Sequence, residues 1–103
     1  MTVSVITFEP FKNDDKWATF QDELESRAQS IHRFADNVLF ATHEGSARDL
    51  FDALNAATRG EMNNLVVIEA KGVQDTTWRG DARTFDWLNE ALPNHEFQRE
   101  VKL

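Results

Sequence analysis

The chain of 103 residues contains no cysteine, only four glycines and two prolines, and fewer basic than acidic residues. The lack of cysteine excludes a disulfide framework, a thiolate metal site and a cysteine nucleophile. So few glycines and prolines argue against a linker or a low-complexity chain. With 41% hydrophobic residues, the composition fits one globular domain over residues 1–103 with one modest core.

Eighteen acidic and eleven basic residues give a net charge of -7. Binding to a phosphate backbone needs clustered lysine and arginine, so this balance disfavours nucleic acid as a partner. The acidity serves solubility, or else it forms a surface that meets a basic partner or mimics nucleic acid. The N-terminus lacks the features of a signal peptide, and no stretch reaches the ~18 apolar residues of a membrane span. We therefore expect a cytoplasmic protein without membrane contact.

Short runs of β-forming residues predict the strands. Residues 2–8 alternate with apolar side chains on both sides, which is typical of a central strand with two covered faces. Residues 31–34 and 38–42 flank a turn-prone segment and predict a hairpin, or alternatively a single bulged strand. Residues 65–70 are a further apolar strand, and the weakly alternating tail 97–103 could form a last edge strand.

Three amphipathic helices are predicted from apolar residues at spacings of three and four. They cover about residues 14–28, 46–58 and 82–92. Asn13 and Asp81 are suited to cap the first and third helices. Ser46 and Asp49 resemble a capping box at the start of the second.

The predicted order is β-α-β-β-α-β, followed by a helix and the tail. This is the split βαβ, ferredoxin-like order of an α+β protein. Its antiparallel sheet carries the first two helices on one face, so the other face needs a cover. An apolar second face favours a homodimer, unless the third helix packs there. The residues that we expect at this interface are Ile6, Phe8, Trp78 and Trp87.

Most catalytic signatures are absent from the sequence. It contains no G-x-S-x-G, no glycine-rich phosphate loop and no His-Glu-x-x-His. The three histidines, His32, His43 and His95, lack the spacing of metal ligands and are interpreted as ordinary strand or surface residues. The large aromatic residues are expected in the core: Phe11, Trp17, Phe20, Phe34, Phe40 and Phe51.

Glu9 is the one candidate catalytic and metal-binding residue. It ends the first predicted strand and lies near Asp14 and Asp15 in the sequence. A carboxylate at a strand end suits Mg²⁺, which prefers oxygen ligands. Two copies of Glu9 could face each other across a dimer axis. The alternative interpretation is a solvated surface acid.

Several segments together resemble one group of proteins. Residues 5–9 (Val-Ile-Thr-Phe-Glu) and 37–42 (Asn-Val-Leu-Phe-Ala-Thr) resemble the first and third strands of the small CRISPR adaptation subunit. Residues 64–72, and Trp78-x-Gly80 followed by Trp87-Leu88, resemble the related SinR-like group of small bacterial and phage proteins. The resemblance covers nearly the whole chain.

This resemblance implies a ferredoxin-like fold and a homodimer joined through sheet faces or by a swapped terminal strand. In members of the CRISPR family with nuclease activity, an aspartate that ends the first strand binds metal. Glu9 stands at the matching position here. Another role in that family is architectural, because the subunit bridges integrase subunits on DNA.

The first functional hypothesis is a non-catalytic dimeric interaction or architectural module. It needs no cofactor, and its partner is a second copy of the chain or another protein. The second is a Mg²⁺-dependent endonuclease that uses paired Glu9, with a basic groove drawn from Lys12, Arg33, Arg48 and Arg79. The third is an acidic decoy that mimics nucleic acid. Its carboxylates would come from the first helix: Asp15, Asp22, Glu23 and Glu25.

Overall fold

The computed structural model describes residues 1–62, 64–72 and 79–92. Over these residues the elements are, in order, β1 (Thr2–Phe8), α1 (Asp14–Arg27), β2 (Ala28–Ala35), β3 (Val38–His43), α2 (Ala47–Ala57), β4 (Leu65–Ala70) and α3 (Ala82–Ala91). The α+β class and the order of these elements are as predicted. The predicted edge strand over residues 97–103, Trp78 and His95 lie outside the described residues.

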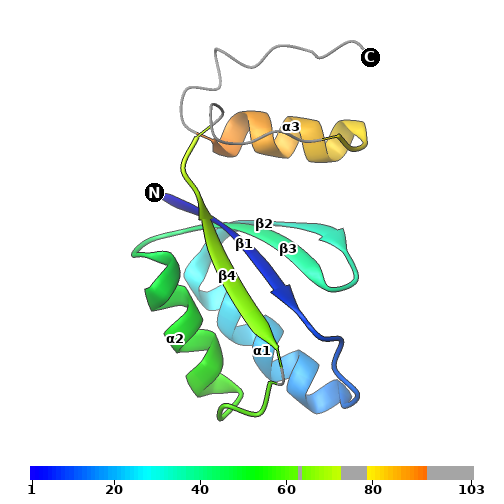
Figure 1. Ribbon diagram of the computed structural model, residues 1–103, viewed down its shortest axis with the longest axis vertical. Coiled ribbons are helices and arrows are strands. Elements are labelled where there is room, and N and C mark those ends of the chain that lie inside the picture. Colours follow the sequence, from blue (N-terminus) through cyan, green and yellow to red (C-terminus); the bar gives the residue numbers. More distant parts are fainter. Residues whose placement is uncertain (63, 73–78, 93–103) are drawn as a thin grey trace.

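The four strands form one antiparallel sheet in the order β2-β3-β1-β4 (Figure 1). β1 lies inside the sheet between β3 and β4, which agrees with its apolar residues on both sides. β2 and β3 form the predicted hairpin, and Asp36 and Asn37 make the turn. The alternative of a single bulged strand is therefore wrong.

Each helix begins at the predicted cap. The side chain of Asn13 accepts a hydrogen bond from the backbone N–H of Asp15 at 2.8 Å. Ser46 and Asp49 form a reciprocal capping box. Asp81 caps α3 by accepting from the N–H of Thr84 at 3.0 Å. Such caps satisfy N–H groups that have no partner inside the helix, and each contributes about 1 kcal/mol.

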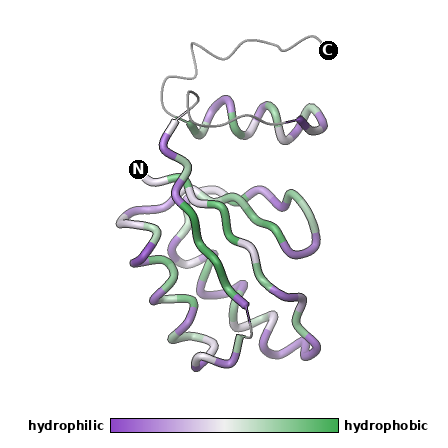
Figure 2. The backbone as a smooth tube through the Cα atoms, in the orientation of Figure 1, coloured by the Kyte–Doolittle hydropathy of each residue, from purple (hydrophilic) through white to green (hydrophobic). Residues whose placement is uncertain are grey.

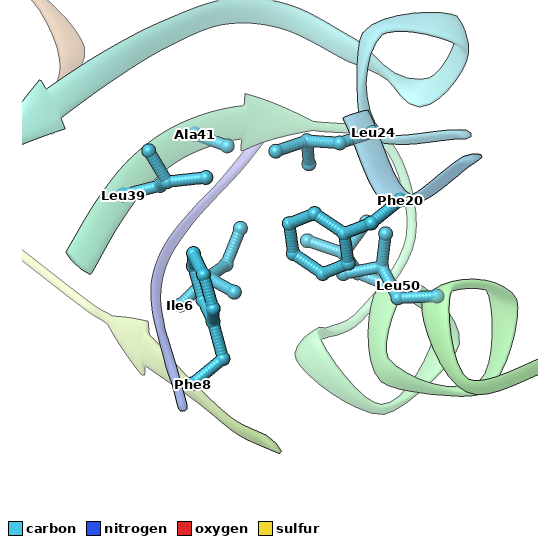
Figure 3. Packing of buried hydrophobic residues seen from close by; sticks show 8 residues of the cluster. Ile6, Phe8, Phe20, Leu24, Leu39, Ala41 and Leu50 are labelled. Atoms are coloured by element: carbon cyan, nitrogen blue, oxygen red, sulfur yellow. The ribbon is translucent and has the colours of Figure 1, made fainter. Parts of the chain in front are cut away.

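The main core lies between the sheet and the two helices α1 and α2, which cover the same face (Figures 1 and 3). The sheet contributes Ile6, Phe8, Leu39 and Ala41, and the helices contribute Phe20, Leu24, Leu50 and Leu54. Full burial of one such large apolar side chain stabilises the fold by about 1.5–3 kcal/mol. This layer therefore supplies most of the hydrophobic stabilisation.

The expectation that Ile6 and Phe8 belong to the second face of the sheet is wrong. Both side chains are buried beneath the helices, with 0% and 3% of their surface exposed. The strand register explains this, because Ile6 pairs with Leu39 on one side and Val67 on the other. Directly paired residues share a face of the sheet, and Leu39 and Val67 both pack in the core under α1 and α2.

Candidate functional site

The second face of the sheet, opposite α1 and α2, carries no charged side chain at the paired positions of its four strands. β1 and β4 contribute the apolar residues Val3, Val5, Val66, Ile68 and Ala70, together with Thr7. β2 and β3 contribute Ser30, His32, Phe34, Val38, Phe40 and Thr42. This composition stands out in a chain with 28% charged residues. Figure 2 shows the hydrophobic stretches along the strands.

Helix α3 covers one end of this second face (Figure 1). Leu88 and Leu92 pack with Val3 in a small buried cluster. Trp87 is half-buried, and its ring lies 6.0 Å from that of His32 and 6.1 Å from that of Phe40. Trp87, expected at an interface, therefore packs on the sheet of its own chain. The packing of α3 on this face was the alternative cover that the sequence left open.

A hydrogen bond ties the start of α3 to the sheet. The Nε2 atom of His32 lies 2.8 Å from Oγ1 of Thr84. Thr84 is buried, with only 3% of its surface exposed. The ring of His32 also lies 6.0 Å from that of Phe40, so the rings of His32, Phe40 and Trp87 form one cluster. His32 therefore helps to hold α3 against β2 by a hydrogen bond and a ring contact.

The rest of the second face is not covered by α3. We give the name open face to its apolar residues, which are Val5, Phe34, Val38, Val66 and Ile68. Phe34, Val66 and Ile68 have 46%, 47% and 56% of their surface exposed. Met1 is the one other exposed large hydrophobic residue among those described. Exposed apolar side chains that gather on one face mark an interaction surface.

Phe34 was expected in the core, and this expectation is wrong. It lies on the edge strand β2, on the face opposite α1 and α2, and its ring stacks on that of Phe40 at 5.3 Å. Its neighbour Arg33 points to the helix face, where its guanidinium lies 5.3 Å above the ring of Trp17. The alternation of the strand therefore places Phe34 on the second face and Arg33 on the face of α1 and α2.

Glu9 follows the end of β1 and is exposed. Its Oε1 atom accepts a hydrogen bond from Nδ2 of Asn64 at 2.6 Å, and its N–H donates to the carbonyl of Asn64 at 3.2 Å. Over residues 1–62, 64–72 and 79–92, no group of three or more potential ligands could hold a metal ion. In the single chain Glu9 therefore joins β1 to the start of β4.

Two of the four basic residues proposed for a groove near Glu9, Arg33 and Arg48, have other contacts. Arg33 stacks on Trp17, and the Nε atom of Arg48 pairs with Asp52 at 3.2 Å on the outside of α2. These two arginines lie on different elements, and the structure does not bring them together at Glu9.

The acids of α1 lie on its solvent side. Asp15, Asp22 and Glu25 are exposed, whereas Glu23 forms an ion pair with Arg27 one turn later in the helix. Because α1 packs against the main core through Phe20 and Leu24, the acids face away from the sheet. They therefore form a separate surface, on the side of the molecule opposite the open face.

Sequence reasoning missed a buried polar pair, Ser4 and His43. Their exposed fractions are 0% and 1%, and Oγ of Ser4 lies 2.8 Å from Nε2 of His43. The other ring nitrogen, Nδ1, lies 2.9 Å from the carbonyl oxygen of Glu44. A carbonyl only accepts, so Nδ1 carries the proton and Nε2 accepts from the hydroxyl of Ser4.

The Ser4–His43 pair has the hydrogen-bond pattern of an activated serine, but the hydroxyl is sealed inside the fold. An open pocket of about 250 Å³ lies beside His43, lined by Ser26, Arg27, Glu44, Asp49 and Leu50. A nucleophile must reach a substrate atom, and Ser4 has no exposed surface. The pair therefore links β1 to β3 and satisfies two buried polar groups.

Three carboxylates, Asp49, Glu61 and Asp81, have pKa values that are lowered from their ordinary values. The N–H of Ser46 donates to Asp49 and lowers its pKa, and the N–H of Thr84 does the same for Asp81. The hydrogen bond and charge of Lys16 lower the pKa of Glu61. These contacts stabilise the ionised carboxylates of Asp49 and Asp81 at helix caps and that of Glu61 beside Lys16 of α1. None of the three carboxylates lies on the open face.

Comparison with known proteins adds no assignment: no family model, no curated protein and no solved structure matches the chain. None of the helices in the described ranges has the length and apolar character needed to cross a membrane.

Proposed function

We propose that the chain is a non-catalytic, homodimeric interaction module with a ferredoxin-like fold, and that the dimer forms on the β4 side of its open face, where Val66 and Ile68 are exposed. The observation that carries this proposal is the gathering of Phe34, Val66 and Ile68 on one uncharged face of the sheet. Burial of apolar surface contributes about 25 cal/mol per Å².

The ferredoxin-like part of the proposal is supported by the strand order β2-β3-β1-β4, with antiparallel pairs throughout. In a split βαβ arrangement each strand that follows a helix lies two places away from the strand before that helix. Here β3 separates β1 from β2, and β1 separates β3 from β4. The proposal includes a distant relationship to the SinR-like group and the CRISPR adaptation subunit, which rests on residues 5–9, 37–42 and 64–72.

The charge distribution supports self-association at this face in particular. Two copies that each carry a net charge of -7 repel one another at long range, and like charges placed directly opposite destabilise a contact. On the open face the contact would bring no charged side chains together. The acids of α1 lie on the opposite side of the molecule, away from such an interface.

Among the described residues, the two candidate reactive groups already have hydrogen-bond partners, which supports a non-catalytic role. The carboxylate of Glu9 is engaged by Asn64, and the hydroxyl of Ser4 is sealed against His43. Ser4 has no exposed surface from which to reach a substrate, and no cluster of metal ligands surrounds Glu9 among the described residues. The resemblance to an architectural subunit points in the same direction.

Two variants test the proposal by solution mass. We expect light scattering at micromolar concentration to give twice the chain mass of 11.8 kDa. Ile68→Lys places a charge on the open face and should give a monomer. Ala56→Lys makes the same change in charge at an exposed position of α2 and should remain a dimer. A monomeric unmodified chain, or a dimeric Ile68→Lys variant, would contradict the proposal.

A further inference from the structure

The two edges of the sheet differ in how well they are protected. β2, at one edge, has irregular pairing with β3 at Ala28/Ser30 and at Arg33/Ala35. Irregular pairing is one of the means by which proteins prevent association at a sheet edge. β4, at the other edge, pairs with β1 over six consecutive residues without a shift. Its sequence, Leu-Val-Val-Ile-Glu-Ala, has one charge and no proline.

The backbone of β4 presents alternate residues to its free side. The carbonyl of Asn64 accepts from Glu9 of the β1 segment, so the polar backbone groups of Asn64 point toward β1. In an antiparallel pair this direction alternates from one residue to the next. The N–H and C=O groups of Val66 and Ile68 therefore also point to β1. Those of Leu65, Val67 and Glu69 point outward, and within the described ranges no strand pairs with that side.

We propose that a second copy of this chain pairs with this edge, β4 against β4 in antiparallel orientation, with Val67 opposite the partner's Val67. This inference rests on the proposed homodimer and specifies how it is joined. In this register Leu65 lies opposite the partner's Glu69, so all three outward-facing residues form hydrogen-bonded pairs. Each such pair exchanges two N–H···O bonds between the strands.

The side chains of β4 fit this register on both faces of the sheet. Val66, with 47% of its surface exposed, lies opposite the partner's Ile68, and Ile68, with 56% exposed, lies opposite the partner's Val66. Each therefore covers the other on the second face. Cross-strand apolar pairs of this kind contribute roughly 0.2–1 kcal/mol each.

Charge also permits a second copy at this edge. Glu69 faces the partner's Leu65, so no like charges stand opposite each other. The two Glu69 residues lie at opposite ends of the paired segment, four residue steps apart. At ~3.3 Å per step this is about 13 Å, which exceeds the screening length of about 8 Å at physiological salt.

Neighbouring registers fit less well. A shift of two residues places Val67 opposite the partner's Glu69 and Val66 opposite the partner's Ala70. It leaves two hydrogen-bonded pairs within β4 in place of three. Ile68 then lies opposite the partner's Ile68. The Val67-centred register is therefore the one that uses the whole strand.

The symmetry of this pairing has a consequence for the open face. A two-fold axis perpendicular to the sheet keeps the second faces of both copies on the same side. The dimer therefore has one continuous eight-stranded sheet, with α1 and α2 of both copies on the other side. Phe34, on the far edge of each copy, remains exposed in this arrangement.

The test replaces the outward-pointing N–H at the centre of the edge. Val67→Pro removes this N–H, while the N–H groups that bond β4 to β1 stay in place. Val67→Ala is the matched control, because it also shortens the side chain but keeps the N–H. We expect sedimentation analysis to give a dimer for Val67→Ala and at least tenfold weaker self-association for Val67→Pro, with circular dichroism confirming that both are folded.

Hydrogen exchange of the unmodified chain gives a readout that does not depend on any variant folding. At concentrations where the dimer dominates, the amides of Leu65, Val67 and Glu69 should be protected, and they should lose this protection on dilution. The amides of Val66 and Ile68, which bond to β1, should stay protected at both concentrations. Unprotected Val67 and Glu69 amides in a dimeric sample would overturn the inference.

The outcomes separate this inference from the proposed function. If Ile68→Lys is monomeric while Val67→Pro associates as tightly as Val67→Ala, the copies meet face to face, so the proposed function stands and the edge pairing is wrong. If the unmodified chain is monomeric at all concentrations, both are wrong.

Discussion

Removing the hydroxyl of the buried Ser4 should destabilise the fold more than removing the hydroxyl of an exposed serine. Ser4→Ala deletes the donor to Nε2 of His43, and both residues are almost fully buried. A buried acceptor left without its partner costs about 1–3 kcal/mol. For a domain of this size, each kcal/mol lowers the melting temperature by about 4–8 °C. Urea unfolding followed by circular dichroism measures this loss as a shift in the midpoint.

Two further variants make this test specific: a control at an exposed serine and a variant that lacks His43. Ser26→Ala removes a hydroxyl that bonds only to the carbonyl of Glu23 on the surface of α1, and it should change stability by less than about 0.5 kcal/mol. In a His43→Leu background, Ser4→Ala should cause no loss of stability or even a gain, because the buried hydroxyl has lost its acceptor. A loss from Ser4→Ala that is the same with and without His43 would refute the role of this hydrogen bond.

The main core and the small cluster under α3 should respond differently to truncation. Leu54→Ala, in the main core, should lower the free energy of unfolding by about 2–5 kcal/mol. Leu88→Ala, in the small cluster, should mainly loosen α3. Amide exchange should then accelerate in α3 while α2 stays protected. Equal loss of protection in both helices would contradict this separation. Stability should also fall in acid, because the pKa values of Asp49, Glu61 and Asp81 are lowered in the folded state. Groups with a lowered folded-state pKa contribute fully above the unfolded-state pKa, near pH 4, and the contribution is lost as the pH falls through the folded-state pKa. Urea midpoints should therefore be lower at pH 3 than at pH 6, and Asp49→Asn should reduce this difference; equal midpoints at the two pH values would contradict the prediction.

The elements could be predicted from the sequence because each carries a local signal. Asn13 and Asp81 mark the starts of helices through their capping side chains, and the Ser46–Asp49 box does so for α2. The turn at Asp36 and Asn37 separates two β-rich runs. These signals depend on a few neighbouring residues, so they can be recognised in a single sequence.

The assignment of faces could not be predicted for β1, because both of its sides are apolar. Nothing within Thr2–Phe8 indicates whether Ile6 or Val5 faces α1 and α2. The answer depends on long-range register, which pairs Ile6 with Leu39 and Val67. The Ser4–His43 pair was missed for the same reason, although the alternation that places His43 on the same side as Leu39 was a usable signal.

Solution mass of the unmodified chain tests the central claim most directly. Light scattering over a range of micromolar concentrations, with and without Mg²⁺, should give twice the chain mass of 11.8 kDa at the upper end. The mass should not depend on the metal, because the proposed interface consists of apolar side chains and strand hydrogen bonds. A chain that stays at 11.8 kDa throughout, or that dimerises only with Mg²⁺, would contradict the account.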